Sequence, residues 1–208
     1  MNEPFPEPRV LIGAHGWLHP GWNGTFYPDD LPEDWRLGYY GNEFPVVGVP
    51  AGAWSGSGPR DWLEDSGGHL RFLCELPVPG MDAARAAEAL EMLGPRCLGV
   101  MLTAPVPEAV VPELLRRWPL AWAGEGEPPP ALRAAGASRC WDGSGVPPPG
   151  GRLNVIRLAA AAPSPRELRG VLEAALAWPG TEHTVLLFTA ANPPVAAMHD
   201  AATLLELM

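Results

Sequence analysis

Short apolar runs recur along the chain at a spacing of roughly 25 residues. Most of these runs are continuous rather than alternating between apolar and polar positions, which is typical of parallel strands covered on both faces. The pattern predicts eight strands, at residues 10–13, 46–49, 70–76, 97–103, 120–123, 138–142, 154–158 and 184–189.

Helical patterns lie between most of these runs. The clearest predicts a helix over residues 164–178, in which Ser164 caps the N-terminus, Pro165 occupies the first turn and Glu167 completes a capping box. Other patterns predict helices at residues 82–94 and 194–207, and shorter ones at 32–41, 60–65, 112–118 and 129–135. The segment 143–153 is too rich in Gly and Pro to form a helix, so the helix after the sixth strand is missing.

The alternation of strands and helices predicts an α/β protein with a parallel sheet. Eight such units favour a single domain over residues 1–208 that closes into a TIM-like (β/α)₈ barrel, small and partly degenerate. An open, doubly wound sheet is the alternative. It lacks support from a Gly-x-Gly-x-x-Gly motif after the first strand.

Composition excludes several classes of function. The 14 basic residues are all Arg, so mechanisms that need a lysine amine are closed. The formal charge of −10 argues against binding to nucleic acid or to an anionic membrane. Cys74, Cys97 and Cys140 are far apart in the sequence and fall in predicted strands, which suits buried thiols. The acidic, proline-rich segment 1–9 does not read as a signal peptide, and no apolar run predicts a membrane span, so we expect a cytoplasmic protein.

The first predicted strand is followed by a segment dense in Trp, Gly and Pro. It reads IGAHGWLHPGWNGTFYP, residues 12–28, and includes the pair Gly16-Trp17, a second Trp at Trp22 and the run Phe26-Tyr27-Pro28. This segment resembles the opening signature of the "domain of unknown function 72" family, and weaker likeness continues to the last predicted helix. The resemblance implies a TIM-barrel-like fold and no assigned activity.

The chain departs from the family's pattern at several strand ends. Glu75 stands where the family's third strand usually ends on Lys, and Ala159-Ala160 replaces the His-Gly pair expected after Leu158, although Arg157 is kept. Most polar residues of the family's barrel mouth are therefore missing. The resemblance identifies the chain as a diverged and shortened member.

In a barrel the active face forms where the strands end and the loops begin. The residues at these places are His15, Trp17, His19, Trp22, Glu75, Thr103, Glu125, Glu127, Asp142, Arg157 and Asn192. Glu75, Asp142 or His15 could act as general acid or base, with Arg157 as an electrostatic clamp on the substrate. A structural ion pair between Arg157 and Glu75 is the alternative, because a buried guanidinium needs a partner.

A second group of residues could bind a ligand. Its members are Trp17, His19, Trp22, Tyr27, Glu125 and Asn192. The aromatic rings would form a stacking wall for a sugar, a base or a peptide, or else belong to the core. Asn192 precedes a helix whose backbone amides suit an anion. Glu125 belongs to an acidic group, either a carboxylate pair for glycoside chemistry or a solvated loop. His15 and His19 are four residues apart in a loop rather than a helix, so no metal site is predicted.

Two classes of function remain open. In the first, the protein binds a small ligand or a partner protein at the barrel mouth through the Trp-rich loop, with little or no catalysis. In the second, it is a hydrolase or lyase acting on a small anionic or carbohydrate-like substrate. Cofactors and partners remain unknown. An open mouth with convergent carboxylate, His and Arg groups favours the enzyme, whereas a mouth filled by Trp side chains favours the binder.

Overall fold

The computed structural model describes residues 10–55, 58–76, 83–106, 117–179 and 182–208. Eight parallel strands run through it, and every predicted strand is present to within a few residues at its ends. They are β1 (Leu11–His15), β2 (Val46–Val49), β3 (Arg71–Glu75), β4 (Cys97–Leu102), β5 (Leu120–Trp122), β6 (Ser138–Arg139), β7 (Leu153–Leu158) and β8 (His183–Phe188).

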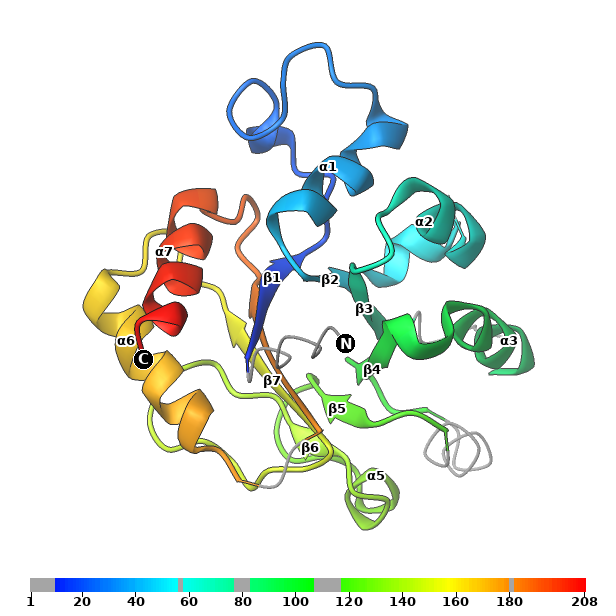
Figure 1. The fold of residues 1–208 in the computed structure, drawn as a ribbon. Coiled ribbons are helices and arrows are strands. Elements are labelled where there is room, and N and C mark those ends of the chain that lie inside the picture. Colours follow the sequence, from blue (N-terminus) through cyan, green and yellow to red (C-terminus); the bar gives the residue numbers. More distant parts are fainter. Residues whose placement is uncertain (1–9, 56–57, 77–82, 107–116, 180–181) are drawn as a thin grey trace, which may run out of the picture.

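The strands form one sheet in the order β6-β5-β4-β3-β2-β1-β8-β7, which curves into a nearly closed barrel (Figure 1). The two edge strands, β6 and β7, meet through a bridge between Trp141 and Ile156. Trp141 N donates to Val155 O at 2.9 Å, and Arg157 N donates to Trp141 O at 2.7 Å. The predicted TIM-like barrel is therefore confirmed, with one narrow seam.

Helices surround the strands (Figure 1). The described ones are α1 (Arg36–Glu43), α2 (Pro59–Asp65), α3 (Ala83–Leu93), α5 (Pro130–Ala134), α6 (Pro165–Ala177) and α7 (Val195–Glu206). The segment 140–152 between β6 and β7 contains no helix, as its Gly and Pro content predicts. Most of the helix predicted at residues 112–118 lies outside the described residues.

The strands separate an inner from an outer core because successive side chains point to opposite faces. Inside the barrel lie residues such as Leu11, Val46, Leu73, Met101 and Val155. The outward side chains join those of the helices in a larger second core. Both faces of the sheet are thus apolar, which explains why the strands read as continuous apolar runs.

In α6 and α7 the local sequence signals can be compared with the observed helices. The capping box of α6 forms as predicted, with Ser164 accepting from Glu167 N and the Glu167 carboxylate accepting from Ser164 N. In α7 the buried residues are Ala197, Met198 and Ala201, so two of the three are small. Among the described residues no helix is both long enough and apolar enough to cross a membrane.

Candidate active site at the barrel mouth

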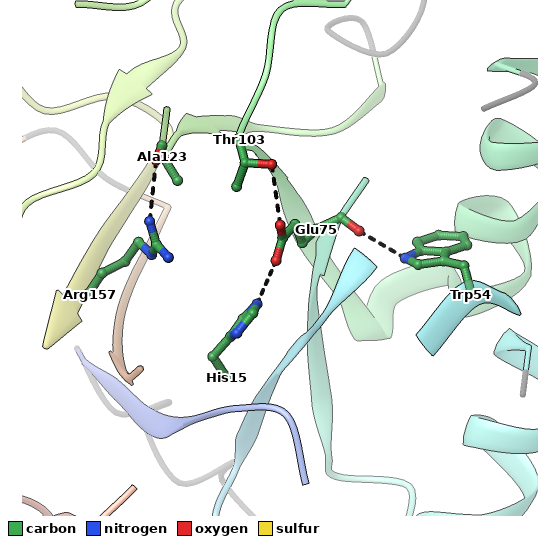
Figure 2. Close-up of polar contacts among 6 residues, drawn as sticks. All are labelled: His15, Trp54, Glu75, Thr103, Ala123 and Arg157. Atoms are coloured by element: carbon green, nitrogen blue, oxygen red, sulfur yellow. Dashed lines mark hydrogen bonds and ion pairs between the residues drawn. The ribbon is translucent and has the colours of Figure 1, made fainter. Parts of the chain in front are cut away.

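Four polar side chains gather where the strands end. His15 is the last residue of β1, Glu75 is the last residue of β3, Thr103 follows β4, and Arg157 is the penultimate residue of β7. Each lies two or four residues beyond an apolar residue of its own strand that points into the barrel. Because side chains alternate between the two faces of a strand, these polar side chains point into the barrel as well. Figure 2 shows these side chains approaching one another from different strands.

Glu75 is the centre of the cluster. His15 Nε2 and Glu75 Oε2 are 2.7 Å apart, and the two side chains are 20% and 14% exposed. Thr103 Oγ1 donates to Glu75 Oε1 at 3.3 Å. Trp54, in a 3₁₀ turn after β2, donates its indole N–H to the Glu75 carbonyl oxygen at 2.8 Å (Figure 2). Both the carboxylate and the backbone of Glu75 are therefore held in place.

Electrostatics keep this carboxylate ionised. Burial raises the pKa of Glu75, but the hydrogen bond and charge of His15, the Thr103 hydroxyl and the charge of Arg157 together outweigh burial. The pKa of Glu75 therefore lies below its ordinary value. The ionised Glu75 accepts a hydrogen bond from His15 Nε2, so the uncharged form of this imidazole carries its lone pair on Nδ1. Nδ1 has no hydrogen-bond partner in the part of the chain that is described.

Arg157 lies across the barrel from Glu75. Its NH1 group donates to Ala123 O at 3.3 Å, and its Nε is buried without a partner among the described residues. The expected ion pair with Glu75 is wrong, since within the same residues Glu75 pairs with His15. The physical reason is topology: β3 and β7 are separated by β2, β1 and β8 in the sheet, so they face each other across the barrel. The Arg157 charge still reaches Glu75 and lowers its pKa.

The aromatic residues of the first loop are buried. Trp17, Trp22 and Tyr27 are 6%, 2% and 1% exposed. Trp22 stacks on Tyr40 of α1, with ring centroids 6.0 Å apart, and the Tyr27 hydroxyl donates to Trp17 O at 2.7 Å. Their ring faces are used for packing between the loop and the helices, and they belong to the outer core. Their role in ligand binding stays a prediction.

His19 and Asn192 connect the first loop to the loop between β8 and α7. His19 Nδ1 lies 3.1 Å from Ala191 O, and Asn192 Oδ1 accepts from Gly21 N at 2.8 Å. Trp22 Nε1 also donates to Pro193 O at 2.8 Å. Beside this junction runs an open groove of about 680 Å³, lined partly by Thr25, Asn192 and His199. Asn192 therefore has a structural partner at the place where an anion was predicted.

The remaining acidic candidates lie in exposed loops. Asp142 accepts from the Ser144 backbone N–H at 2.9 Å and from its hydroxyl at 2.7 Å, and these bonds lower the pKa of Asp142. Glu127 pairs with Arg139 at 3.3 Å, and Glu125 is exposed. No contact between these carboxylates and the His15–Glu75 pair is found among the described residues. The structure thus brings together His15, Glu75 and Arg157, but it does not bring Asp142 into contact with them.

Metal ligands and thiols add little to this site. No group of three or more His, Cys, Asp or Glu side chains that could hold a metal ion occurs within the described ranges. The three cysteines are free thiols, with Cys74 buried and the other two partly buried. Cys74 and Cys97 lie on the neighbouring strands β3 and β4, and Cys97 Sγ donates to Gly99 O at 3.7 Å. The interaction between the two thiols raises the pKa of Cys74, as burial does, and lowers that of Cys97.

The fold and the polar mouth define an α/β barrel protein of the TIM-like class. Residues 11–54 match the family described as "Protein of unknown function DUF72". The structure is similar to that of a DUF72 family protein from Enterococcus faecalis, with 11% sequence identity, 96% coverage of both chains and a TM-score of 0.62. A second structure of that protein also matches at 11% identity, covering 97% of this chain and 98% of that one, with a TM-score of 0.56.

These comparisons confirm the resemblance to the DUF72 family, and its sequence signal lies in the Trp-rich opening segment. At 11% identity the structural likeness shows the fold alone. No curated protein matches the chain. The family is described as one of unknown function, so it assigns no activity to the site.

Two members of the mouth were not predicted from the sequence. Trp54 is not among the residues predicted for the mouth, yet its indole N–H donates to the backbone carbonyl of Glu75. The second is the Ala123 carbonyl oxygen, which accepts a hydrogen bond from the Arg157 guanidinium. A backbone acceptor has no sequence signal. The signal for Trp54 was its place just after a strand end, where polar side chains meet in a barrel.

Proposed function

We propose that this protein is an enzyme of the hydrolase or lyase type, whose barrel mouth binds a small molecule and whose His15 transfers a proton to or from it. The observation that supports this proposal is the 2.7 Å contact between His15 Nε2 and Glu75 Oε2, inside the barrel and at the carboxyl ends of the strands. Active sites of barrels with this fold lie at that end.

Glu75 acts on the imidazole rather than on the substrate. By accepting the Nε2 proton it fixes the tautomer and the orientation of His15, and its negative charge stabilises the imidazolium that forms when Nδ1 takes up a proton. Thr103 and Trp54 hold Glu75 in this position. His15 is therefore the proton-transfer group, and the other three are positioning residues.

The buried aromatic loop favours this proposal over a binder that uses Trp side chains. Trp17 and Trp22 are almost fully buried in the outer core, so they do not fill the mouth. The groove beside the first loop supports a second candidate, ligand binding without turnover. A ligand of that groove would stop stabilising a His199→Ala variant and still stabilise a His15→Ala variant, as measured by thermal shift.

A ligand screen followed by an assay for turnover tests the proposal. Phosphate esters, carboxylates and glycosides are first ranked by the thermal shift they produce, with and without divalent metals, and the stabilising compounds are then assayed for product by mass spectrometry. Loss of the general base typically costs about 10²–10⁴ in rate, so we expect His15→Ala to lose about that factor. Glu75→Gln is expected to lose activity too, because a glutamine NH₂ cannot replace the anion that stabilises imidazolium.

The matched control is Glu182→Gln, which removes an exposed carboxylate that pairs with Arg152 at 3.0 Å, away from the mouth. It is expected to keep the wild-type rate. Wild-type turnover by a folded His15→Ala protein contradicts the proposal, as does the absence of turnover for every stabilising compound.

A further inference from the structure

Arg157 has more hydrogen-bond donors than the described protein uses. A guanidinium carries five N–H groups, and a buried N–H without an acceptor is costly. Here NH1 donates to Ala123 O at 3.3 Å, and Nε is buried without an acceptor among the described residues. The charged group is thus bound on one edge by a single neutral carbonyl.

Three exposed arginines of the chain are different. Arg139, Arg152 and Arg169 each pair with a glutamate, at 3.3, 3.0 and 2.9 Å. These three are about half exposed or more, so water also solvates their charge. Arg157 is more buried, and within the described residues no carboxylate lies within ion-pair distance of it. Arg36 also has a buried Nε without a partner among the described residues, but it lies at the start of α1 over the Tyr27 ring, whereas Arg157 lies at the barrel mouth.

The immediate surroundings of Arg157 offer no replacement. The charge of Arg157 lowers the pKa of Glu75, but the Glu75 carboxylate already accepts hydrogen bonds from His15 and Thr103. The side chains that line the neighbouring β5 side of the barrel, Ala121 and Ala123, have no acceptor. No acceptor for the remaining edge is found among the described residues, and a bound molecule would supply one.

The edge without an acceptor has a defined shape, but its Nε is covered by protein atoms, so a ligand reaches it only when the Arg157 side chain shifts. With NH1 used by Ala123, the Nε and NH2 groups form the side of the guanidinium that donates two parallel hydrogen bonds. Two oxygens of a carboxylate or a phosphate match this fork, whereas a sugar hydroxyl provides a single neutral acceptor. Figure 2 shows the guanidinium reaching toward the space that His15 and Glu75 also face.

We propose that Arg157 binds an oxyanion of the substrate, a carboxylate or a phosphate, through its Nε–NH2 edge. This inference rests on the proposed function, because it takes the barrel mouth as the place where the substrate binds, and it selects the anionic class over the carbohydrate-like class. The anion is bound on the β7 side, and His15 acts on the part of the substrate that faces β1.

Two simple probes test the inference without knowledge of the substrate. Inorganic phosphate and succinate are titrated separately into the full chain, with sodium chloride at matched ionic strength as the blank. Nuclear magnetic resonance follows the ¹⁵Nε–¹Hε signal of Arg157, and thermal shift follows stability. We expect one probe to move the Arg157 signal saturably and to raise the melting temperature beyond the salt blank. Phosphate as the effective probe points to a phosphate ester, and succinate points to a carboxylate.

Variants then connect the binding to the fork. Arg157→Gln is expected to lower the affinity for the effective probe by about tenfold or more. Arg157→Lys is expected to lower it by a similar factor, because lysine keeps the charge but not the two parallel donors. Arg139→Gln, on the neighbouring strand β6, is the control and is expected to bind like the wild type. Binding retained in a folded Arg157→Gln protein overturns the inference. So does an Arg157 signal in the wild type that neither probe moves, a result that needs no variant to fold.

His15→Ala separates this inference from the proposed function. It leaves the Nε–NH2 edge intact, so oxyanion binding should persist while turnover is lost. Oxyanion binding at Arg157 without turnover of any compound overturns the enzyme proposal alone. Turnover of a neutral substrate at the wild-type rate by Arg157→Gln overturns the inference alone.

Discussion

At the scale of single residues, Glu75 determines what the barrel mouth can do. The family resemblance places a lysine at this strand end, and a lysine there would repel Arg157 and could not accept the His15 proton. The acidic residue instead pairs with His15 and is influenced by the charge of Arg157. The mouth of this barrel thus contains a His–Glu pair on the side opposite an arginine.

The same residue predicts how stability depends on pH. The pKa of Glu75 is lower in the folded chain than in the unfolded chain. At a pH between these two pKa values, the unfolded state therefore binds more protons than the folded state. Glu75 therefore contributes stability above the ordinary glutamate pKa of about 4.3, and this contribution is lost as the pH drops through the lower folded value. The free energy of unfolding of Glu75→Gln, measured with urea, should accordingly decrease less steeply with falling pH than that of the wild type. The exposed Glu206→Gln at the end of α7 should keep the wild-type slope, and an identical slope for Glu75→Gln would contradict the assigned direction.

At the scale of elements, α1 connects the first two strands through one hydroxyl. The Tyr40 hydroxyl accepts from Ala14 N at 2.7 Å and donates to Val46 O at 2.8 Å, and Tyr40 is fully buried. Burial raises the pKa of Tyr40, so the hydroxyl stays protonated. Gly13 makes this approach possible, since a Cβ there would lie 1.9 Å from Val46 O and 2.8 Å from the Tyr40 hydroxyl. The strand end that carries His15 is therefore positioned by a helix residue.

Removing this hydroxyl should destabilise the barrel. Tyr40→Phe leaves one buried N–H and one buried C=O without their partner, which costs about 1–3 kcal/mol of unfolding free energy. Chemical denaturation measures the change. Tyr39→Phe, next to it in α1 and without a hydrogen bond to the described residues, is the matched control and should change stability little. Equal effects of the two substitutions would show that the hydroxyl bridge is not what stabilises β1 and β2.

At the scale of the whole molecule, the barrel closes at its weakest seam beside the candidate site. Strand β6 has two residues, and the bridge between Trp141 and Ile156 completes the ring to β7. The backbone N–H of Arg157 is bonded to Trp141 O within this seam. The position of the proposed anion-binding arginine thus depends on barrel closure.

Hydrogen exchange can test the weakness of the seam. Local opening should expose the amides of Trp141 and Arg157 more often than those of Val47 and Leu73 in the continuous β2–β3 ladder. We expect faster exchange at the seam by about one to two orders of magnitude, measured residue by residue on the native protein. Equal protection at the two places would mean that the barrel opens only as a whole.

Sequence patterns predicted the elements well because the relevant signals are local. The apolar runs located all eight strands, and Ser164 and Glu167 located the start of α6. The Gly- and Pro-rich segment after Asp142 correctly predicted a missing helix. The site was predicted less completely. His15, Glu75 and Arg157 were named, but an ion pair between Glu75 and Arg157 was one of the two alternatives, and Asp142, which makes no contact with them, was also a candidate for acid–base chemistry.

The sequence by itself determined which segments become strands, which side chains alternate between the two faces, and that strands and helices alternate as in an α/β protein, because each of these depends on neighbours along the chain. Only the tertiary structure decided that the sheet curves into a nearly closed ring and which strand end faces which. The order of strands places β3 opposite β7, so Glu75 bonds to His15, and the Nε of Arg157 has no acceptor among the described residues. Pairing across the ring depends on barrel diameter and closure, and no local pattern of residues contains either.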